Sequence, residues 1–219
     1  MLYKSLLFIR TILRLLLYFF SSFKRYANII IIIIIYKPKV ILEIGVYKGK
    51  RSLEMMEAAK IFNNKIYYHG FDLFEEFFKR KNILQKELSK KPKDINFIKR
   101  KINNIGNVTL YKGYTKKTLP VFIKKKIKPD LVFIDGGHSI KTILNDWNLV
   151  KKAMTKKTIV IFDDYYSNSK EIIKKFGCNK IINNLSKKYT WKLLSIKDRI
   201  YINKNVVGVN LVMVRFKQA

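Results

Sequence analysis

Two apolar runs in this chain are each followed by residues that could do chemistry. The run 131–134 is followed by Asp135, two glycines and His138, and the run 158–162 by Asp163-Asp164. Each run predicts a buried strand, and ligands of an open parallel sheet bind outside the carboxyl ends of its strands. Three carboxylates placed that closely are unfavourable unless a cation or a proton joins them. The pattern therefore favours a metal-assisted transferase site.

A glycine turn earlier in the chain predicts a nucleotide-binding element. Residues 40–45 form an apolar run that ends at Gly45, and Gly49 precedes a helical pattern over residues 53–62. A strand, a glycine turn and a helix in this order bring backbone N–H groups up to a ligand. The dinucleotide fingerprint needs G-x-G-x-x-G, whereas the spacing from Glu43 is E-x-G-x-x-x-G. This difference argues against NAD.

Asp72 ends the next predicted strand, residues 65–71. An acid in this place can accept hydrogen bonds from both ribose hydroxyls of a nucleotide. The alternative is a helix N-cap, because residues 73–78 have a helical pattern. The two roles are compatible.

Residues 42–49 and Gly70-Phe71-Asp72 resemble two motifs of the class I S-adenosylmethionine-dependent methyltransferases. The resemblance implies an α/β fold: a Rossmann-like, doubly wound sheet with an antiparallel final strand, preceded by N-terminal helices. It also implies a set of cofactor-binding residues. Gly45 and Gly49 would let the loop approach the methionine part, with Glu43 in the same motif, while Ser52 would meet the carboxylate and Asp72 the ribose. Residues 111–120 look like the "G…TLP" segment of one methyltransferase branch, which places Gly113 and Tyr114 near the adenine.

A second group of motifs is more specific than the glycine turn. It consists of Asp135-Gly136-Gly137-His138-Ser139, Asn145-Asp146-Trp147 and Phe162-Asp163-Asp164-Tyr165-Tyr166. It resembles the macrocin O-methyltransferase-like branch, whose metal-dependent members methylate hydroxyls of sugars and related metabolites. The resemblance runs from about Val40 to the C-terminus. It implies that Asp135, Asp163 and Asp164 ligate a divalent cation, with Mg²⁺ expected, and that Asp135 and Gly136 also lie beside the cofactor.

This chemistry agrees with the donor groups. A hard cation prefers carboxylate oxygens, and it acidifies and orients a bound hydroxyl. Transfer of the methyl group then gains mainly from positioning. We therefore expect S-adenosylmethionine and Mg²⁺ as cofactors, with a sugar, glycan or related small molecule as acceptor.

The chain departs from the sugar-acting relatives at Gly137, where some of them carry an aspartate that acts as general base. The neighbouring His138 has an unperturbed pKa of about 6.5, which suits proton removal near neutral pH. We therefore predict His138 and Asp135 as the catalytic pair. In the alternatives, the imidazole only bonds the neighbouring loop or contacts the cofactor.

The N-terminal segment differs from the rest of the chain. Residues 1–23 are strongly apolar, with Lys4, Arg10 and Arg14 on one side of the predicted helix. These charges argue against a transmembrane span, and no small-residue cleavage site follows. Peripheral contact with a membrane, packing on the domain and a homo-oligomer interface all stay open. Residues 29–35 are seven isoleucines, for which we favour a buried helix, so that residues 1–36 precede a methyltransferase domain at 37–219.

The last third of the chain is expected to contain a helix (170–188), a strand (190–196) and a final strand (206–216). Lys197-Asp198-Arg199 would lie in a solvated loop between the strands. Cys178 is the one cysteine, which excludes an internal disulfide and fits a cytoplasmic location.

Between 79 and 107, helical stretches are expected at 83–88 and 95–104, as an insert over the site or as a solvated helical pair.

The formal net charge of +31 is extreme. It suits an anionic partner such as nucleic acid or a lipid surface, but Lys, Asn and Ile are abundant throughout, as an AT-rich coding sequence would give. A nucleic-acid methyltransferase is less favoured, because the Asn/Asp-Pro-Pro-aromatic motif is replaced by Asp135-Gly136-Gly137-His138. A non-catalytic, membrane-associated binding protein of the same fold is the remaining alternative.

Overall fold

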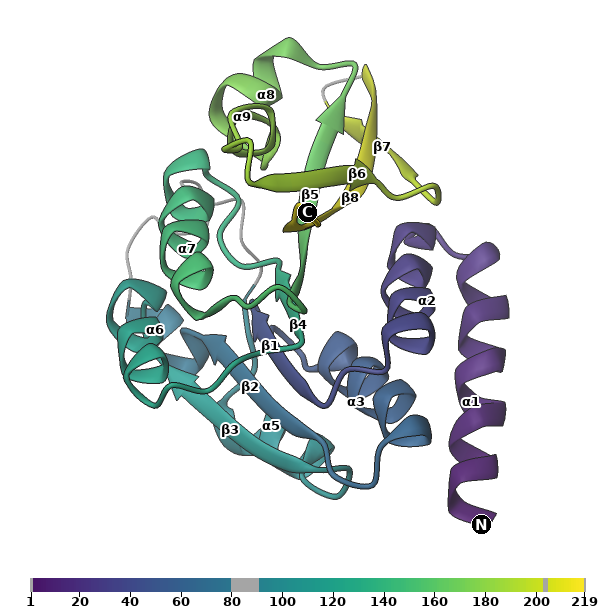
Figure 1. Ribbon diagram of the computed structural model, residues 1–219. Helices are drawn as coiled ribbons and strands as arrows, with labels where there is room; N and C mark the ends of the chain where they lie inside the picture. Colours follow the sequence, from purple (N-terminus) through teal and green to yellow (C-terminus); the bar gives the residue numbers. More distant parts are fainter. Residues whose placement is uncertain (1, 80–90, 203–204, 219) are drawn as a thin grey trace.

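The computed structural model describes residues 2–79, 91–202 and 205–218, which fold around one mixed sheet (Figure 1). The strands are β1 (Val40–Ile44), β2 (Tyr67–Asp72), β3 (Asn107–Lys112), β4 (Leu131–Ile134), β5 (Ile159–Ser167), β6 (Tyr189–Leu193), β7 (Asp198–Ile202) and β8 (Asn205–Phe216). Their order is β3-β2-β1-β4-β5-β8-β6, and β7 also pairs with β8. Strands β1 to β5 are parallel, and β8 runs antiparallel to its three neighbours.

Helices cover both faces of the sheet. They are α1 (Leu2–Phe19), η1 (Lys24–Tyr26), α2 (Ala27–Tyr36), α3 (Lys50–Phe62), η2 (Phe74–Lys79), α5 (Ile95–Ile102), α6 (Thr115–Lys124), α7 (Ile140–Ala153), α8 (Lys170–Lys175) and α9 (Asn179–Asn183). Side chains alternate along each strand, so that Ile41 and Phe133 join a core with α2, α3 and α5, whereas Leu42 and Val132 join a core with α6, α7 and α9. The expected doubly wound fold is confirmed.

The strand order reverses between β1 and β4, and this is where a ligand crevice is expected in an open α/β sheet. The two strands pair directly, with Ile44 opposite Ile134. The backbone N–H of Asp135 then donates to the carbonyl oxygen of Ile44 at 2.8 Å. The loops that follow β1 and β4 are therefore adjacent, although about ninety residues separate them in sequence.

Three predictions for the second half of the chain were wrong in detail. Strand β5 does not end at Phe162 but continues to Ser167, with a bulge between Phe162 and Tyr165. The predicted helix 170–188 is broken into α8 and α9, because Gly177 (φ 84°) packs so closely on the Asp164 carbonyl that a Cβ would lie 2.4 Å from its oxygen. Lys197-Asp198-Arg199 does not lie wholly in a solvated loop: Asp198 begins β7 and is buried. The stretch 83–88 lies outside the described residues.

The N-terminal helices pack on the face of the sheet that α3 covers (Figure 1). The isoleucine run forms α2 and is largely buried, which confirms the predicted helix. Ile33 of α2 and Ile41 of β1 belong to the same core, so the proposed boundary after residue 36 does not separate two cores. Among the described residues, no helix is both long and apolar enough to cross a bilayer.

Candidate active site

The glycine loop after β1 lies against the end of β4. Gly45 has a φ of 96°, and a Cβ on it would be 1.9 Å from the carbonyl oxygen of Asp135. Only glycine fits both the backbone conformation and the space. Gly49 (φ 65°) is the N-cap of α3, whose first N–H groups follow the loop. The glycine loop, which is predicted to bind the methyl donor and is called the donor loop below, is thus in direct contact with the predicted acidic site.

Asp72 at the end of β2 ties the glycine loop to the next strand. One oxygen accepts from the Tyr47 backbone N–H at 2.8 Å, and the other accepts from Phe74 N–H at 3.2 Å. The second bond is the predicted N-cap role, and it leaves Asp72 half-buried beside the loop. Gly113 donates its N–H to the Asp72 carbonyl at 2.9 Å, and Tyr114 follows, also half-buried. The structure therefore brings Asp72, Gly113 and Tyr114 together at one sheet edge.

Glu43 and Ser52 lie beneath the loop, fully buried. The Ser52 hydroxyl donates to the Glu43 carboxylate at 2.5 Å, and the Tyr68 hydroxyl also donates to Glu43. Burial raises the pKa of Glu43 to about 8, although both hydroxyl bonds act against the increase. In this structure these groups attach α3 to the sheet, and contacts of Glu43 and Ser52 with the cofactor stay a prediction.

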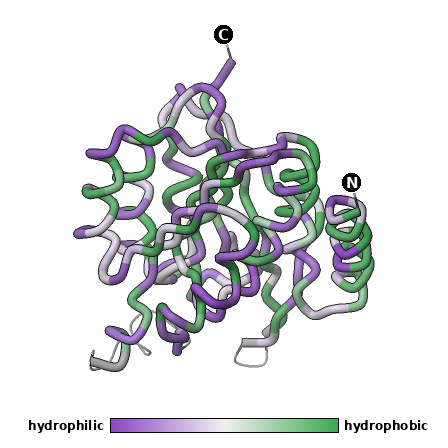
Figure 2. Tube along the Cα trace, turned by 90° about the horizontal axis from the view of Figure 1, so that it is seen from below, coloured by the Kyte–Doolittle hydropathy of each residue, from purple (hydrophilic) through white to green (hydrophobic). Residues whose placement is uncertain are grey.

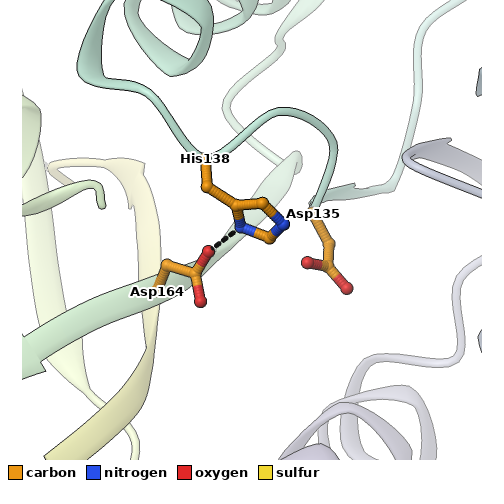
Figure 3. A group of neighbouring side chains, drawn as sticks. All are labelled: Asp135, His138 and Asp164. Atoms are coloured by element: carbon orange, nitrogen blue, oxygen red, sulfur yellow. Dashed lines mark hydrogen bonds and ion pairs between the residues drawn. The ribbon is translucent and has the colours of Figure 1, made fainter. Parts of the chain in front are cut away.

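The acidic centre consists of Asp135, His138 and Asp164, whose donor atoms lie within 4.8 Å of one another (Figure 3). His138 Nδ1 bonds the Asp164 carboxylate. The bulge in β5 makes this contact, since Asp164 has a φ of 61°, which a regular strand does not allow. Gly177 closes the group by donating its N–H to the His138 carbonyl at 2.9 Å.

Asp163 faces a different partner from its neighbour Asp164. Its two oxygens accept from Nε and Nη2 of Arg25, each at 2.8 Å, and the Tyr26 hydroxyl donates to it at 2.8 Å. Burial would raise the pKa of Asp163, but the Arg25 guanidinium outweighs it and holds the pKa below its usual range. The predicted cation-ligand set of Asp135, Asp163 and Asp164 is therefore not assembled, because Arg25 already neutralises Asp163 and His138 takes its place in the group.

Two further cations, Arg25 and Arg51, and the phenol of Tyr26 belong to this centre, and they were not predicted from the sequence. Tyr26 lies 3.4 Å from Asp135 through its hydroxyl, and Arg51 stacks on its ring at 3.9 Å. Arg51 comes just after Gly49 and also pairs with Glu54. The basic residues directly after the glycine turn were an available signal for Arg51, whereas no local pattern connects Arg25 or Tyr26 to the site.

The protonation states follow from these contacts. Burial alone would lower the pKa of His138, but the facing Asp164 carboxylate outweighs it and the pKa rises to about 9. Burial, with Asp163 and Asp164 nearby, holds the pKa of Asp135 well above its usual range. With no cation bound, His138 and Asp135 both favour their protonated forms in this arrangement, and the role of His138 as general base stays a prediction.

These three side chains are suitable ligands for a divalent cation. They suit Mg²⁺, which was expected, and also Mn²⁺. Two carboxylates suit Mg²⁺ or Mn²⁺, and an imidazole in the set favours a first-row transition ion such as Mn²⁺ over Mg²⁺. Such an ion would be held by Asp135, His138 and Asp164.

The fold and this site define a methyltransferase domain, and comparisons with known proteins agree. Residues 42–165 match the family described as "Methyltransferase domain", and the chain belongs to this family. The matched segment runs from β1 to β5 and contains the glycine loop and the acidic centre.

Solved structures show the same fold at low sequence identity. An O-methyltransferase from Bacillus cereus in complex with SAH is 14% identical, with a TM-score of 0.58 over 89% of this chain and 81% of that chain. The O-methyltransferase TomG from Streptomyces achromogenes, in complex with SAM, is 13% identical, with a TM-score of 0.59 over 90% and 82%. The SAH-bound Podospora anserina methyltransferase PaMTH1 is 15% identical, with a TM-score of 0.58 over 90% and 80%.

Among curated proteins, an uncharacterised protein of Acanthamoeba polyphaga mimivirus is 29% identical over 85 residues. The match covers 38% of this chain and 37% of that relative.

Proposed function

We propose that the protein is an S-adenosylmethionine-dependent O-methyltransferase that acts on a hydroxyl of a sugar, glycan or related small molecule. One observation carries the proposal: Gly45 of the donor loop abuts Asp135 of the acidic centre so closely that a Cβ would overlap its carbonyl. A methyl donor bound on that loop would present its methyl group to an acceptor at the acidic centre. The SAM and SAH complexes of proteins with the same fold support this assignment.

The chain's own groups can hold the donor. Gly45 and Gly49 leave the two ends of the loop without side chains, and the N-terminal N–H groups of α3 suit the carboxylate of the methionine part. The Ser52 hydroxyl is occupied by Glu43, so the backbone of the first turn supplies this contact. We assign Asp72 to the ribose and Gly113 and Tyr114 to the adenine side, with Gly136 also beside the cofactor.

A divalent cation would be held by Asp135, His138 and Asp164. When bound, it supplies Lewis-acid polarisation of the acceptor hydroxyl. Mg²⁺ agrees with the two carboxylates, and Mn²⁺ agrees with the whole set.

Asp135 is the proton acceptor that the geometry favours. Its carboxylate belongs to the acidic centre, and its carbonyl contacts Gly45 of the donor loop. A bound donor would supply the methyl group: the acceptor oxygen would bond to the methyl carbon while the carbon–sulfur bond breaks with its electron pair going to sulfur, and the hydroxyl proton would pass to Asp135. His138 is held by Asp164 and would be one of the groups that hold the cation.

Methyl transfer to nucleic acid is a second candidate, favoured by the net charge of +31. It predicts binding to RNA or DNA that weakens steeply with salt.

Calorimetric titration with S-adenosylmethionine and with its demethylated product tests the donor. We expect binding that Asp72→Asn weakens and that Glu171→Gln, an exposed change on α8, leaves intact. Absence of binding by the folded wild-type protein contradicts the proposal.

Incubation with labelled methyl donor and panels of sugars, glycans and RNA identifies the acceptor by mass spectrometry. An O-methylated sugar product that Asp135→Asn abolishes is the expected result, and a methylated nucleic acid would favour the second candidate instead.

A further inference from the structure

The polar side of helix α1 packs against α3. Arg10 and Arg14 both pair with Glu57 of α3, the first at 3.0 Å. The Tyr18 hydroxyl donates to Glu54 of the same helix at 2.6 Å. Two members of the basic stripe, Arg10 and Arg14, are thus paired within the chain, whereas Lys4 is exposed.

The opposite side of α1 is apolar and uncovered. We define the outer face of α1 as six residues that are each at least 52% exposed: Leu6, Ile9, Leu13, Leu16, Leu17 and Phe20. At about 100° per residue the five in α1, together with Phe20 directly after it, share the side of the helix opposite the buried Leu7, Thr11 and Tyr18. Figure 1 shows α1 as the outermost element on its side of the molecule, and in Figure 2 much of its trace has the colour of hydrophobic residues. Helix α1 therefore turns an apolar side outward, whereas a surface helix normally turns its apolar side toward the core.

A helix turned in this way needs a covering partner. A helix that only packs on its own domain turns its apolar side inward, and contiguous apolar patches on soluble monomers usually mark an interaction site. A lipid surface and a second copy of this chain could each cover the outer face.

Charge decides between the two occupants. The chain has 46 lysines and arginines against 15 acidic residues. Two copies would repel each other, whereas an anionic lipid surface attracts such a protein. The apolar arc also includes the exposed Phe8 and Ile12, which makes it broader than the narrow seam of a coiled coil.

We propose that α1 docks on anionic membranes, lying in the plane of the interface with its outer face toward the acyl chains. The inward arginines keep the helix attached to α3 while the outer face is buried in lipid. The exposed Lys4 and Lys24, near the two ends of the helix, would lie at headgroup level. Such a helix lies on the membrane and does not span it.

Vesicle binding of the full chain tests the proposal. Sedimentation with phosphatidylcholine vesicles, with and without phosphatidylserine, is measured for the wild type, for Leu13→Gln with Leu16→Gln, and for Val121→Gln with Leu144→Gln. The second pair is a matched control, since Val121 and Leu144 are exposed apolar residues of α6 and α7 on the other face of the sheet. We expect the partition coefficient on anionic vesicles to fall about tenfold or more for the α1 pair only.

A fluorescent label reports where the helix lies. Cys178 is buried and is the one cysteine of the chain, so Leu13→Cys and Val121→Cys can be labelled selectively with an environment-sensitive dye. A blue shift on anionic vesicles is expected for the label at 13 and not at 121. Equal vesicle binding by all variants overturns the proposal. So does a lipid-independent dimer that the α1 pair dissociates while vesicle binding stays unchanged.

Discussion

The guanidinium of Arg25 holds the carboxylate of Asp163 through two hydrogen bonds of 2.8 Å, across 138 residues of sequence. The same side chain donates to Asp198 at 2.6 Å through Nη1, and the Arg25 backbone N–H also donates to Asp198, at 3.1 Å. Three distant segments, η1, β5 and β7, therefore meet at one buried cation. The acidic centre receives part of its neutralising charge from the N-terminal segment of its own chain.

Replacing Arg25 by alanine should destabilise the protein by about 3–5 kcal/mol, because it leaves Asp163 and Asp198 buried without their cation. Arg25→Lys keeps the charge but cannot make the two-point contact, so an intermediate loss is expected. Urea unfolding followed by circular dichroism measures both. The control is Arg199→Ala, an exposed arginine on β7, for which a change below about 0.5 kcal/mol is expected. Equal losses for Arg25→Ala and Arg199→Ala would contradict this account of the ion pair.

The contact between Gly45 and Asp135 makes a second prediction. Gly45→Ala should reduce the affinity for the methyl donor about a hundredfold or more, since the methyl group must displace the Asp135 backbone and the φ of 96° is strained for alanine. Gly49→Ala is also strained at its φ of 65°, but its methyl group would meet side-chain atoms alone, the nearest of Ile98 at 3.1 Å. It should cost about 1 kcal/mol of stability, with a smaller effect on affinity. Calorimetric titration measures the affinity of both variants for the donor, and thermal unfolding measures their stability. Similar affinities for the donor would show that the close approach has no role in binding.

Most of the fold follows from local sequence patterns. The apolar runs that became β1 and β4 are buried on both sides, and glycine or acidic residues end them, so their length and type were predictable. The break at Gly177 was not, because its cause is a carbonyl thirteen residues earlier that packs against it. Asp198 begins a strand because it meets Arg25, and no pattern around residue 198 indicates that partner.

The site was predictable where it depends on strand ends and not where it depends on side-chain direction. Asp135 and Asp164 were expected together, since their strands are neighbours. The bulge that turns Asp164 toward His138, and leaves Asp163 to Arg25, depends on the packing of Gly177 and the N-terminal segment. The principle that close carboxylates need a cation was sound, but for Asp163 that cation is a guanidinium.

The pairing of His138 with Asp164 predicts how stability depends on pH. Because the pKa of His138 in the folded protein, about 9, lies above its unfolded value of about 6.5, the pair stabilises the fold fully below pH 6.5 and loses this contribution as the pH rises through 9. The shift corresponds to about 3 kcal/mol. Urea unfolding at intervals between pH 6 and pH 10, with a chelator present, should show this loss in the wild type and not in His138→Gln. The same slope in both proteins would assign the pH dependence to other groups.

Cation binding distinguishes the two aspartates of β5. If the group shown in Figure 3 binds the ion, Asp164→Asn should weaken Mn²⁺ binding about tenfold or more, because it removes one of three donors. Asp163→Asn should leave the affinity within about threefold, although it destabilises the fold by weakening the contact with Arg25. Mn²⁺ binding followed by electron paramagnetic resonance measures both directly, in the absence of methyl donor. Loss of binding in both Asp163→Asn and Asp164→Asn would restore the ligand set expected from the sequence, since Arg25 would then have to leave Asp163 when the cation binds.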